Sequence, residues 1–333
     1  MRRASAVSRR RFLRISAASA GCAALAPLAS AGQQDAFTWR GIAFGNLASI
    51  ELRHSDPARI RRTMVSATAE IARLESVMSL YRPASALVEL NRRGHLDAAP
   101  ADLVQVLSRA QAIGGISGGA FDVTVQPLWQ VYADHFSKPG ADPQGPHAGL
   151  IDRAAERVDY RDVEIEPAAI RLSRPGMAVT LNGIAQGYIT DRIVDLLKNE
   201  GFEHVLADLG EIRALGRAPL DQPWRAAIKS PFDESVEANE IELGGQALAT
   251  SGSYGFRFDP AGQFHHLFDP RTGGCPSRYA SVSVLAPDAT TADALATACN
   301  LMDADAIALA LRAAGAHRAF VIDRDGTARW IAS

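Results

Sequence analysis

The apolar residues of this chain recur with two periods, and together these predict a fold that mixes helices and strands. From residue 57 to residue 78, apolar side chains return every three or four positions, which is typical of a helix that buries one face. Asp56 and Pro57 suit the N-cap and the first position of that helix. Shorter apolar runs bounded by Gly, Pro and Asn have the length and composition of strands.

The order of these elements favours the α+β class. Helices are expected at 57–78, 101–116, 184–199 and 304–314, with a further helix around Asp293 and a short one after Ser85. Strands are expected at 41–52, 157–165, 169–173, 177–182, 203–208, 224–229, 237–243, 246–250, 279–286, 318–323 and 327–332. Residues 137–147, dense in Pro and Gly, predict a surface loop. Because strands cluster without regular βαβ alternation, we expect mixed or antiparallel sheets packed against helices.

The first 31 residues have the plan of a removable export signal. SRRRFLR at residues 8–14 matches the twin-arginine (Tat) pattern, an apolar run follows, and Ala29-Ser30-Ala31 suits a cleavage site. We therefore expect a Tat signal peptide at 1–31 and one mature periplasmic domain at 32–333. A lipoprotein anchor at Cys22 is the weaker alternative, because Ser19 stands where such sites prefer Leu.

Removing this leader changes the charge of the protein. Six of the 35 lysines and arginines lie in it and none of the 37 acidic residues does, which leaves 29 basic residues and a net charge of about −8. That balance argues against general binding of nucleic acid or anionic membranes. Two cysteines remain, Cys275 and Cys299, and their spacing does not show whether they pair.

The most informative pair of polar residues is Asp293 and Thr297. They stand four residues apart in an Ala- and Leu-rich segment, so both side chains lie on one face of a helix. A carboxylate and a hydroxyl side by side are hard oxygen donors that suit Mg²⁺ better than zinc or copper. Taken alone, the pair is more typical of an ordinary first-turn or N-cap Asp and a Thr bonded to its own backbone.

Other segments offer ligand contacts. Tyr81 could stack on a flat heterocycle, and the glycines before Phe121 and Asp122 let the backbone approach a ligand closely. At 181–188 a strand is expected to turn through Gly183 into a helix N-terminus, which offers free N–H groups for phosphate, and 208–216 is expected to support it. Each segment taken alone also fits plain packing or a turn.

A histidine pair precedes a polar turn at residues 265–273. His265, His266 and Asp269 could suggest zinc, but adjacent residues of a strand point to opposite sides, which argues against it. A single histidine there, His266, remains a candidate proton acceptor.

Read in order, these segments resemble one family, ApbE, the FAD:protein FMN transferases. The resemblance is carried by SLYRPASALVELN (79–91), GGAFDVTVQPL (118–128), NGIAQGYITD (182–191), TSGSY (250–254), HHLFDPRTG (265–273) and SVSVLAPDATTADALATA (281–298). It covers nearly all of 40–333 and implies a T-fold-like α+β domain. It also implies Mg²⁺-dependent transfer of FMN from FAD to a Thr or Ser hydroxyl of an acceptor protein, with release of AMP.

The resemblance also implies site residues. The metal ligands would be the Ala185 carbonyl, Asp293 and Thr297, which makes Asp293 a catalytic residue. His266 is the candidate for activating the acceptor hydroxyl because of its place beside the polar turn. The flavin contacts it implies are Phe44, Tyr81, Ala120, Phe121, Asp122, Asn182, Tyr188 and the region of His266.

The chain departs from the family pattern in three places. Phe44 stands where the family has Met, Asn182 replaces a Gly, and Gln186 replaces a Lys. Losing that Lys removes a positive charge that the resemblance places near the pyrophosphate of FAD.

Two other functions remain open at this point. One is a Mg²⁺-dependent FAD pyrophosphatase that gives FMN and AMP, and the other is a non-catalytic periplasmic flavin-binding protein. For the transferase, the Tat leader resembles the NosX branch of the family, which implies an exported acceptor such as the membrane flavoprotein NosR of nitrous oxide reduction.

Overall fold

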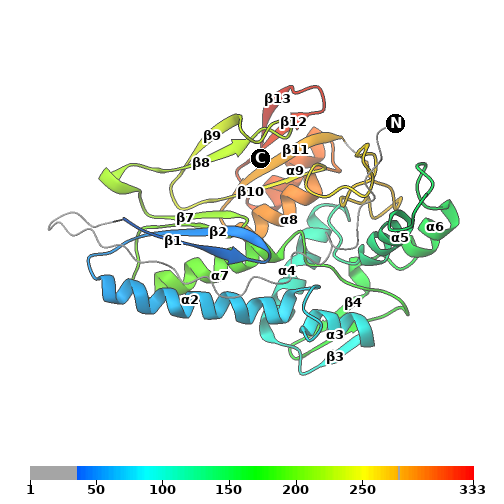
Figure 1. The fold of residues 1–333 in the computed structure, drawn as a ribbon, viewed down its shortest axis with the longest axis horizontal. Helices are drawn as coiled ribbons and strands as arrows, with labels where there is room; N and C mark the ends of the chain where they lie inside the picture. Colours follow the sequence, from blue (N-terminus) through cyan, green and yellow to red (C-terminus); the bar gives the residue numbers. More distant parts are fainter. Residues whose placement is uncertain (1–35, 277) are drawn as a thin grey trace.

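The computed structural model describes residues 36–276 and 278–333, and the predicted leader and Cys22 lie outside the described residues. Within them the fold is α+β, as predicted, and every strand pairing of the three sheets is antiparallel. Figure 1 shows the helices gathered below and to the right of the large sheet, with the C-terminal hairpin above them.

The large sheet has eight strands in the order β1-β2-β6-β7-β10-β11-β12-β13. Their bounds are Ala36–Ala43, Asn46–Arg53, Val205–Asp208, Ile212–Leu215, Ala247–Gly252, Tyr279–Ala286, Arg318–Asp323 and Ala328–Ala332. Two smaller sheets are formed by β3 (His95–Asp97), β5 (Ala169–Leu172) and β4 (Val163–Glu166), and by β8 (Trp224–Lys229) and β9 (Glu237–Leu243).

Eight α-helices surround this sheet in the described residues. They are α2 (Pro57–Met78), α3 (Ala86–Arg93), α4 (Ala101–Ile116), α5 (Gln126–Phe136), α6 (Ala148–Ala155), α7 (Ala185–Asn199), α8 (Ala289–Cys299) and α9 (Ala304–Ala314). Local sequence explains several helix ends: the Asp56 side chain accepts from the N–H groups of Ala58 and Arg59, and Gly94 ends α3 with φ +74°.

The large sheet is covered on both faces, which explains why every residue of β11 is buried. Helices α2, α7, α8 and α9 pack on one face, where Ile50, Val205, Ala249 and Val282 join their core. The β8–β9 hairpin packs on the other face through Trp224, Ile228 and Ile241, against a set that includes Leu248 and Leu285. A sheet buried on both sides is a rigid platform, and α8, which carries Asp293, is packed directly on it.

The sequence predictions differ from the structure where turns and short elements decide the fold. The predicted strand at 41–52 is a hairpin, because Phe44 and Gly45 both adopt positive φ and reverse the chain. Residues 177–181 form no strand: the N–H of Val179 donates to the Asn91 side chain and that of Thr180 to the carbonyl of Val123. Of 157–165, only the end is strand β4. Helices α5 and α6 and strands β3 and β7 were not predicted, while 137–147 is the predicted loop between α5 and α6.

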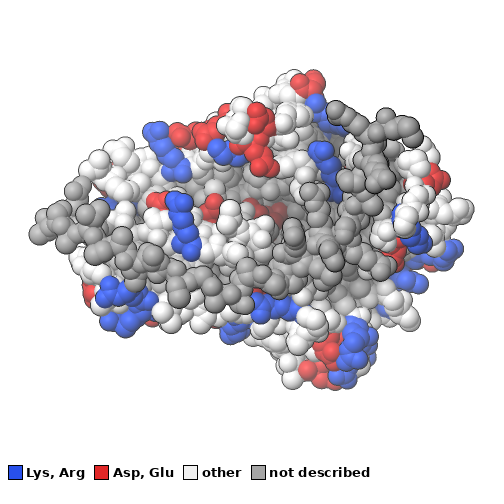
Figure 2. All heavy atoms as spheres, in the orientation of Figure 1, with Lys and Arg blue, Asp and Glu red and all other residues white. Residues whose placement is uncertain are grey.

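The described surface is mixed in charge. Figure 2 shows basic and acidic side chains interspersed, with acidic ones gathered over the β8–β9 hairpin. There Glu237 and Glu240 pair with Lys229 at 2.8 Å and Arg225 at 3.0 Å. None of the helices described has both the length and the apolar character that a membrane crossing requires.

Candidate active site

One cavity of about 230 Å³ collects most of the predicted site residues. It lies where the first turn of α7, the face of α8 that carries Asp293 and Thr297, the end of β10 and residues 254–270 meet. Its lining includes Ala120, Phe121, Asp122, Asn182, His266, Asp293 and Thr297. Phe44, Tyr81, Ala185 and Tyr188 are not among the lining residues.

Two glycines let α7 and α8 approach closely beside this cavity. A Cβ on Gly187 would lie 2.2 Å from the Ala289 carbonyl oxygen and 2.8 Å from the Asp293 Cβ, so only glycine fits. A Cβ on Gly183 would lie 2.9 Å from Thr297 Oγ1. Ala185, buried between the two glycines, is the first residue of α7. The structure thus places Thr297 against Gly183 and Asp293 against Gly187, while Ala185, between the two glycines in the chain, lies outside the cavity lining.

Asp191 fixes the relative position of the same two helices. It lies on α7, and its carboxylate accepts from the backbone N–H groups of Ala289 and Thr290, both at 2.8 Å. The Thr290 hydroxyl and Arg213 on β7 donate to it as well, at 2.5 and 2.9 Å. The buried carboxylate of Asp191, on α7, therefore caps the N-terminus of α8. The N–H groups that it caps lie one helical turn before Asp293.

The cavity wall is acidic. Burial raises the pKa of Asp293 to about 7. The hydrogen bond from the N–H of Gly187 lowers this pKa, and the nearby charge of Asp191 raises it. Burial, and then the nearby charge of Asp293, raise the pKa of Glu211 well above its usual range. Burial also raises the pKa of Asp122. Among the described residues that line the cavity there is no Lys or Arg, so the carboxylates have no fixed cationic partner there.

These donors fit Mg²⁺. Asp293 and Thr297 offer a carboxylate and a hydroxyl on one helix face, and the Ala185 carbonyl would add a third oxygen at the start of α7. All are hard oxygen ligands, few enough to leave coordination positions open for phosphate and water. A buried carboxylate with a raised pKa is costly in the absence of a cation, which is a second reason for this fit.

His266 lines the cavity, and one of its ring nitrogens is hydrogen-bonded to the backbone. Its Nδ1 is 3.2 Å from the carbonyl oxygen of Phe256, which can only accept, so Nδ1 carries the proton and Nε2 is the basic nitrogen. Nε2 lies towards Gly255, where a Cβ would be 3.7 Å away. Burial lowers the pKa of His266, so the ring is neutral at pH 7 and able to take a proton.

The other two residues of the alternative zinc cluster are engaged elsewhere. His265 is fully buried, and its Nδ1 accepts from the N–H of Leu267 at 3.3 Å. Asp269 forms an ion pair with Arg271 at 2.8 Å. Of the three residues, His266 alone lines the cavity.

The predicted flavin contacts divide into two groups. Phe121 and Asn182 line the cavity with an aromatic ring and an exposed amide. Asp122 also lines it, but its carboxylate accepts from the N–H and hydroxyl of Thr124 and from the N–H of Tyr160, so it holds a turn. By holding this turn, Asp122 positions Ala120 and Phe121 at the cavity.

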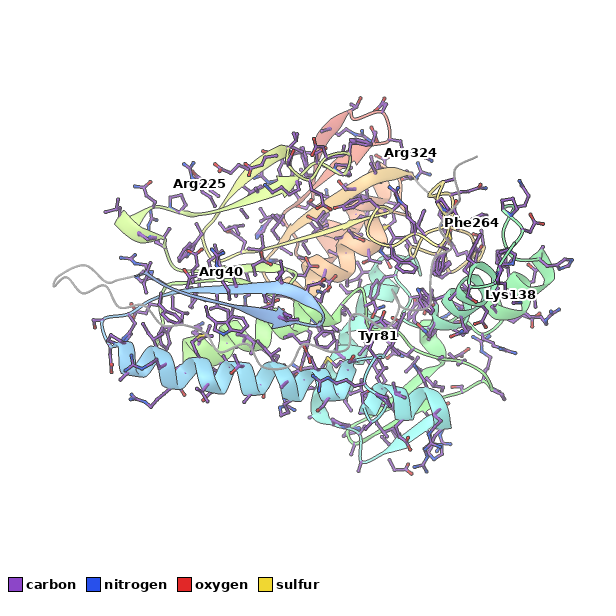
Figure 3. All side chains as sticks on the ribbon, in the orientation of Figure 1. Arg40, Tyr81, Lys138, Arg225, Phe264 and Arg324 are labelled. Carbon is purple, nitrogen blue, oxygen red and sulfur yellow. The ribbon has the colours of Figure 1, made fainter. Side chains whose placement is uncertain are left out.

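The second group lies outside the cavity lining. The Tyr188 hydroxyl donates to Asp102 and Gln105 on α4, so its polar end pins α7 to α4. Tyr81, labelled in Figure 3, lies on the loop between α2 and α3 with 64 % of its surface exposed. Phe44 forms the tip of the β1–β2 hairpin, which is tied down by a bond from its N–H to Glu75 Oε1 at 2.8 Å.

Glu211 and Trp129 line the cavity but were not predicted as site residues from the sequence. Glu211 lies in the segment that was expected only to support the site, and nothing in its neighbours signals that it is buried next to Asp293. Trp129 lines the cavity from α5, and it belongs to an aromatic cluster with Phe256 and Phe258, at centroid distances of 6.2 and 5.9 Å. This cluster extends to Phe264, which Figure 3 places beside α5 and α6. A run of aromatic residues spaced irregularly in 256–268 was its one sequence signal.

Comparisons with known proteins agree with this geometry. The ApbE family profile matches residues 44–321. The FAD:protein FMN transferase of Treponema pallidum is 30% identical over 286 residues, which cover 78% of this chain and 77% of that protein. The enzyme of the same name from Vibrio cholerae is 33% identical over 232 residues, 68% of this chain and 69% of its own. The apo structure of Pseudomonas stutzeri flavinyl transferase ApbE matches with a TM-score of 0.75 at 26% identity, over 91% of this chain and 97% of that one.

The fold and the cavity define an α+β enzyme whose site is built from buried oxygen donors. The chain belongs to the ApbE family, as the sequence motifs predicted. The predicted enzyme class, transferase, is confirmed with it.

Proposed function

We propose that this chain is a Mg²⁺-dependent FAD:protein FMN transferase. It would move FMN from FAD to a Thr or Ser hydroxyl of an acceptor protein and release AMP. The observation that carries this proposal is the composition of the cavity: Asp293, Thr297 and Glu211 line it, and no Lys or Arg does among the described residues. A dianionic pyrophosphate can bind beside these carboxylates only together with a cation that offsets the negative charges.

The residues would divide the work as follows. Asp293, Thr297 and the Ala185 carbonyl would hold Mg²⁺, which when bound neutralises charge on the phosphates and orients them. Phe121 and Asn182 would contact the flavin portion of FAD, the first through its ring and the second through its amide. The hydrogen bonds of Asp191 to the N–H groups at the start of α8, which we call the Asp191 clamp, would hold α7 and α8 together. The oxygen ligands on the two helices would then stay in place during the reaction.

The chemical step would be a substitution at the phosphorus of the FMN portion. The acceptor hydroxyl oxygen forms a bond to that phosphorus, and the bond from it to the bridging oxygen breaks. AMP leaves with the bridging oxygen and its electron pair. His266 Nε2 would accept the hydroxyl proton, since Nδ1 is committed to the Phe256 carbonyl.

One observation keeps the pyrophosphatase as a second candidate. Tyr81, which the family resemblance places at the flavin, is largely exposed and lies outside the cavity lining. With that ring turned to solvent, water could take the place of the acceptor hydroxyl. The non-catalytic alternative is disfavoured because both Asp293 and Thr297 are present at the cavity.

We also propose a periplasmic location and an exported acceptor, on the strength of the twin-arginine leader. NosR is the candidate acceptor. Deleting the gene in a host without a second family member should leave the periplasmic domain of NosR without covalent FMN. A domain that stays fully flavinylated would contradict this acceptor.

The transferase is tested by following both products in one incubation. The mature chain is mixed with FAD, Mg²⁺ and an acceptor domain, and AMP and acceptor-bound flavin are measured together. A transferase gives equal amounts of each. AMP without bound flavin indicates the pyrophosphatase, and neither product indicates a flavin-binding protein.

A further inference from the structure

Two exposed apolar side chains face each other at the tip of the β1–β2 hairpin. Ile42 on β1 and Leu47 on β2 are partners in the strand register, and 54 % and 87 % of their surfaces are exposed. Side chains that oppose each other in this way lie about 5 Å apart, so the two form one apolar surface. We call this pair the hairpin patch.

The hairpin patch departs from the pattern of its own strands. Ala48, Ile50 and Leu52 are buried on the face that the helices cover, so the residues between them point to the other face. On that face the remaining positions of both strands are polar, charged or small: Ala36, Thr38, Arg40, Ser49, Glu51 and Arg53. The β8–β9 hairpin covers this face over β7, β10, β11 and β12, and none of the described residues of β1 or β2 belongs to that contact. The hairpin patch is therefore an uncovered apolar surface where the alternation favours polar residues.

The strand register places the hairpin patch at the end of the sheet where the cavity lies. Ser49 pairs with Asp208, the last residue of β6, and Leu47 lies two residues beyond Ser49. Beyond Asp208, in the same direction, the chain turns through Gly210 to Glu211, which lines the cavity. The tip of the hairpin thus projects past β6 on the side of the candidate active site.

The tip is also tied to the body of the protein. The N–H of Phe44 donates to Glu75 on α2, and Glu75 forms an ion pair with Arg82, which follows Tyr81 in the chain. A surface that is already held in place loses little conformational freedom when a partner binds.

We infer that the hairpin patch is a docking surface for the acceptor protein, which meets it with an apolar side chain. The inference rests on the proposed function, because FMN can reach a hydroxyl of another protein only when that protein covers the surface beside the cavity. Arg40, labelled in Figure 3, points to the same face two residues before Ile42. It is exposed and takes part in no ion pair of the described residues. An acidic group beside the apolar side chain of the acceptor would therefore complete the contact.

Two other occupants fit this surface less well. A second copy of the chain, related by a two-fold axis at the tip, would bring the two Arg40 side chains together. One pair of apolar side chains also falls far below the area that a stable dimer buries. A lipid surface is disfavoured by the excess of acidic residues in the chain without its predicted leader.

The test measures the kinetics of FMN transfer to the periplasmic domain of NosR. Ile42→Thr combined with Leu47→Thr removes the apolar surface and keeps residues that suit strands. The KM for the acceptor should rise by about tenfold or more, because two apolar contacts are lost. The kcat, the dissociation constant for FAD and the melting temperature should stay at the wild-type values, since neither residue lines the cavity.

Two further variants define the surface. Arg40→Glu should also raise the KM for the acceptor, and this effect should shrink as the salt concentration is raised. Val65→Thr combined with Leu309→Thr removes similarly exposed apolar side chains from α2 and α9. This double variant is the matched control and should change none of the four quantities.

An unchanged KM in the Ile42→Thr, Leu47→Thr protein, or an equal rise in the control variant, would overturn the inference. Wild-type binding to vesicles of phosphatidylcholine and phosphatidylglycerol that the doubly substituted hairpin loses would assign the patch to lipid instead. A wild-type dimer in sedimentation that the same variant dissolves would assign it to a second copy. A wild type that transfers no FMN to the acceptor domain overturns the proposed function for this acceptor and the inference with it. Wild-type transfer with equal KM values in both proteins overturns the inference alone.

Discussion

The backbone N–H of Gly187 donates to Asp293 Oδ2 at 3.0 Å, across a contact so close that any other residue at position 187 would collide with α8. This bond joins the start of α7 to the middle of α8. It orients the carboxylate of Asp293, which lines the cavity together with Gln186 of α7. The contact between the two helices is therefore the structural basis of the candidate metal site.

Removing the Asp293 carboxylate should abolish Mg²⁺-dependent turnover without unfolding the protein. Asp293→Ala is expected to lower AMP release by about 100-fold or more, since a principal metal ligand is lost. Its melting temperature should not fall, because a buried carboxylate with a raised pKa is removed. Asp293→Asn still accepts from the N–H of Gly187 and so keeps the packing, but it lacks the carboxylate charge and should be inactive as well. Activity within a few-fold of the wild type at saturating Mg²⁺ would refute the role of Asp293.

Thr297 should affect the metal requirement more than stability. Thr297→Val keeps the volume and loses the donor oxygen, so the Mg²⁺ concentration for half-maximal activity should rise by about tenfold. Thr297→Ser retains the oxygen and should stay close to the wild type. If the melting temperature collapses and the Mg²⁺ requirement does not move, Thr297 is a packing residue.

His266 should act on turnover and on its pH dependence. His266→Asn is expected to reduce transfer by about 100-fold and to leave FAD affinity unchanged, because the lost group is a base. In the wild type, activity should fall as the pH drops through the pKa of His266, which burial holds below 6.5. Weaker FAD binding with unchanged turnover of the bound state would instead make His266 a substrate contact.

Removing the charge of Asp191 should lower the stability of the protein and raise its Mg²⁺ requirement. Asp191→Asn puts an N–H₂ group against the N–H groups that cap α8, and the expected loss of stability is about 2–4 kcal/mol. Where the variant remains folded, its Mg²⁺ requirement should rise and its activity recover at high Mg²⁺. Asp195→Asn is the matched control, because Asp195 pairs with the same Arg213 at 3.2 Å but is half exposed. Equal effects of the two variants would contradict a positioning role for Asp191.

His265 should make the protein less stable in acid. Burial lowers its pKa to about 4 in the folded protein, against 6.5 when it is exposed. Between these values the unfolded chain binds a proton that the folded chain does not, so stability falls as the pH is lowered from 6.5 to 4. From pH 7.5 to pH 5, urea denaturation should show the wild type losing about 1–2 kcal/mol more than His265→Leu. Parallel pH profiles of the two proteins would exclude His265 as a source of acid sensitivity.

The parts of the fold that follow local rules could be predicted from the sequence. Helices α2, α4 and α9 and strands β8, β9 and β11 have the predicted bounds, because periodicity, caps and glycines define them locally. The β1–β2 hairpin was missed because its turn depends on positive φ at Phe44, a residue that does not signal it. Helices α5 and α6 were missed because they owe their burial to the aromatic cluster, which only the tertiary structure brings together.

The same distinction holds for the candidate site. Asp293 and Thr297 were visible as a pair at helical spacing, and motif order linked them to Phe121, Asn182 and His266. Glu211 and Trp129 could not be found this way, since their place at the cavity depends on burial and on strand pairing far away in the sequence. Tyr188 shows the converse: it lies within a matching motif, but its hydroxyl is bound to α4.

The most direct measurement of the central claim is covalent flavin on an acceptor protein. The mature chain is incubated with FAD, Mg²⁺ and the acceptor, and flavin fluorescence is read on a denaturing gel with intact mass as confirmation. Parallel samples contain EDTA or the Asp293→Asn variant. The account predicts one FMN added to the acceptor by the wild type with Mg²⁺ and none in the other two samples. Flavinylation that persists with EDTA, or at the wild-type rate in Asp293→Asn, would contradict it.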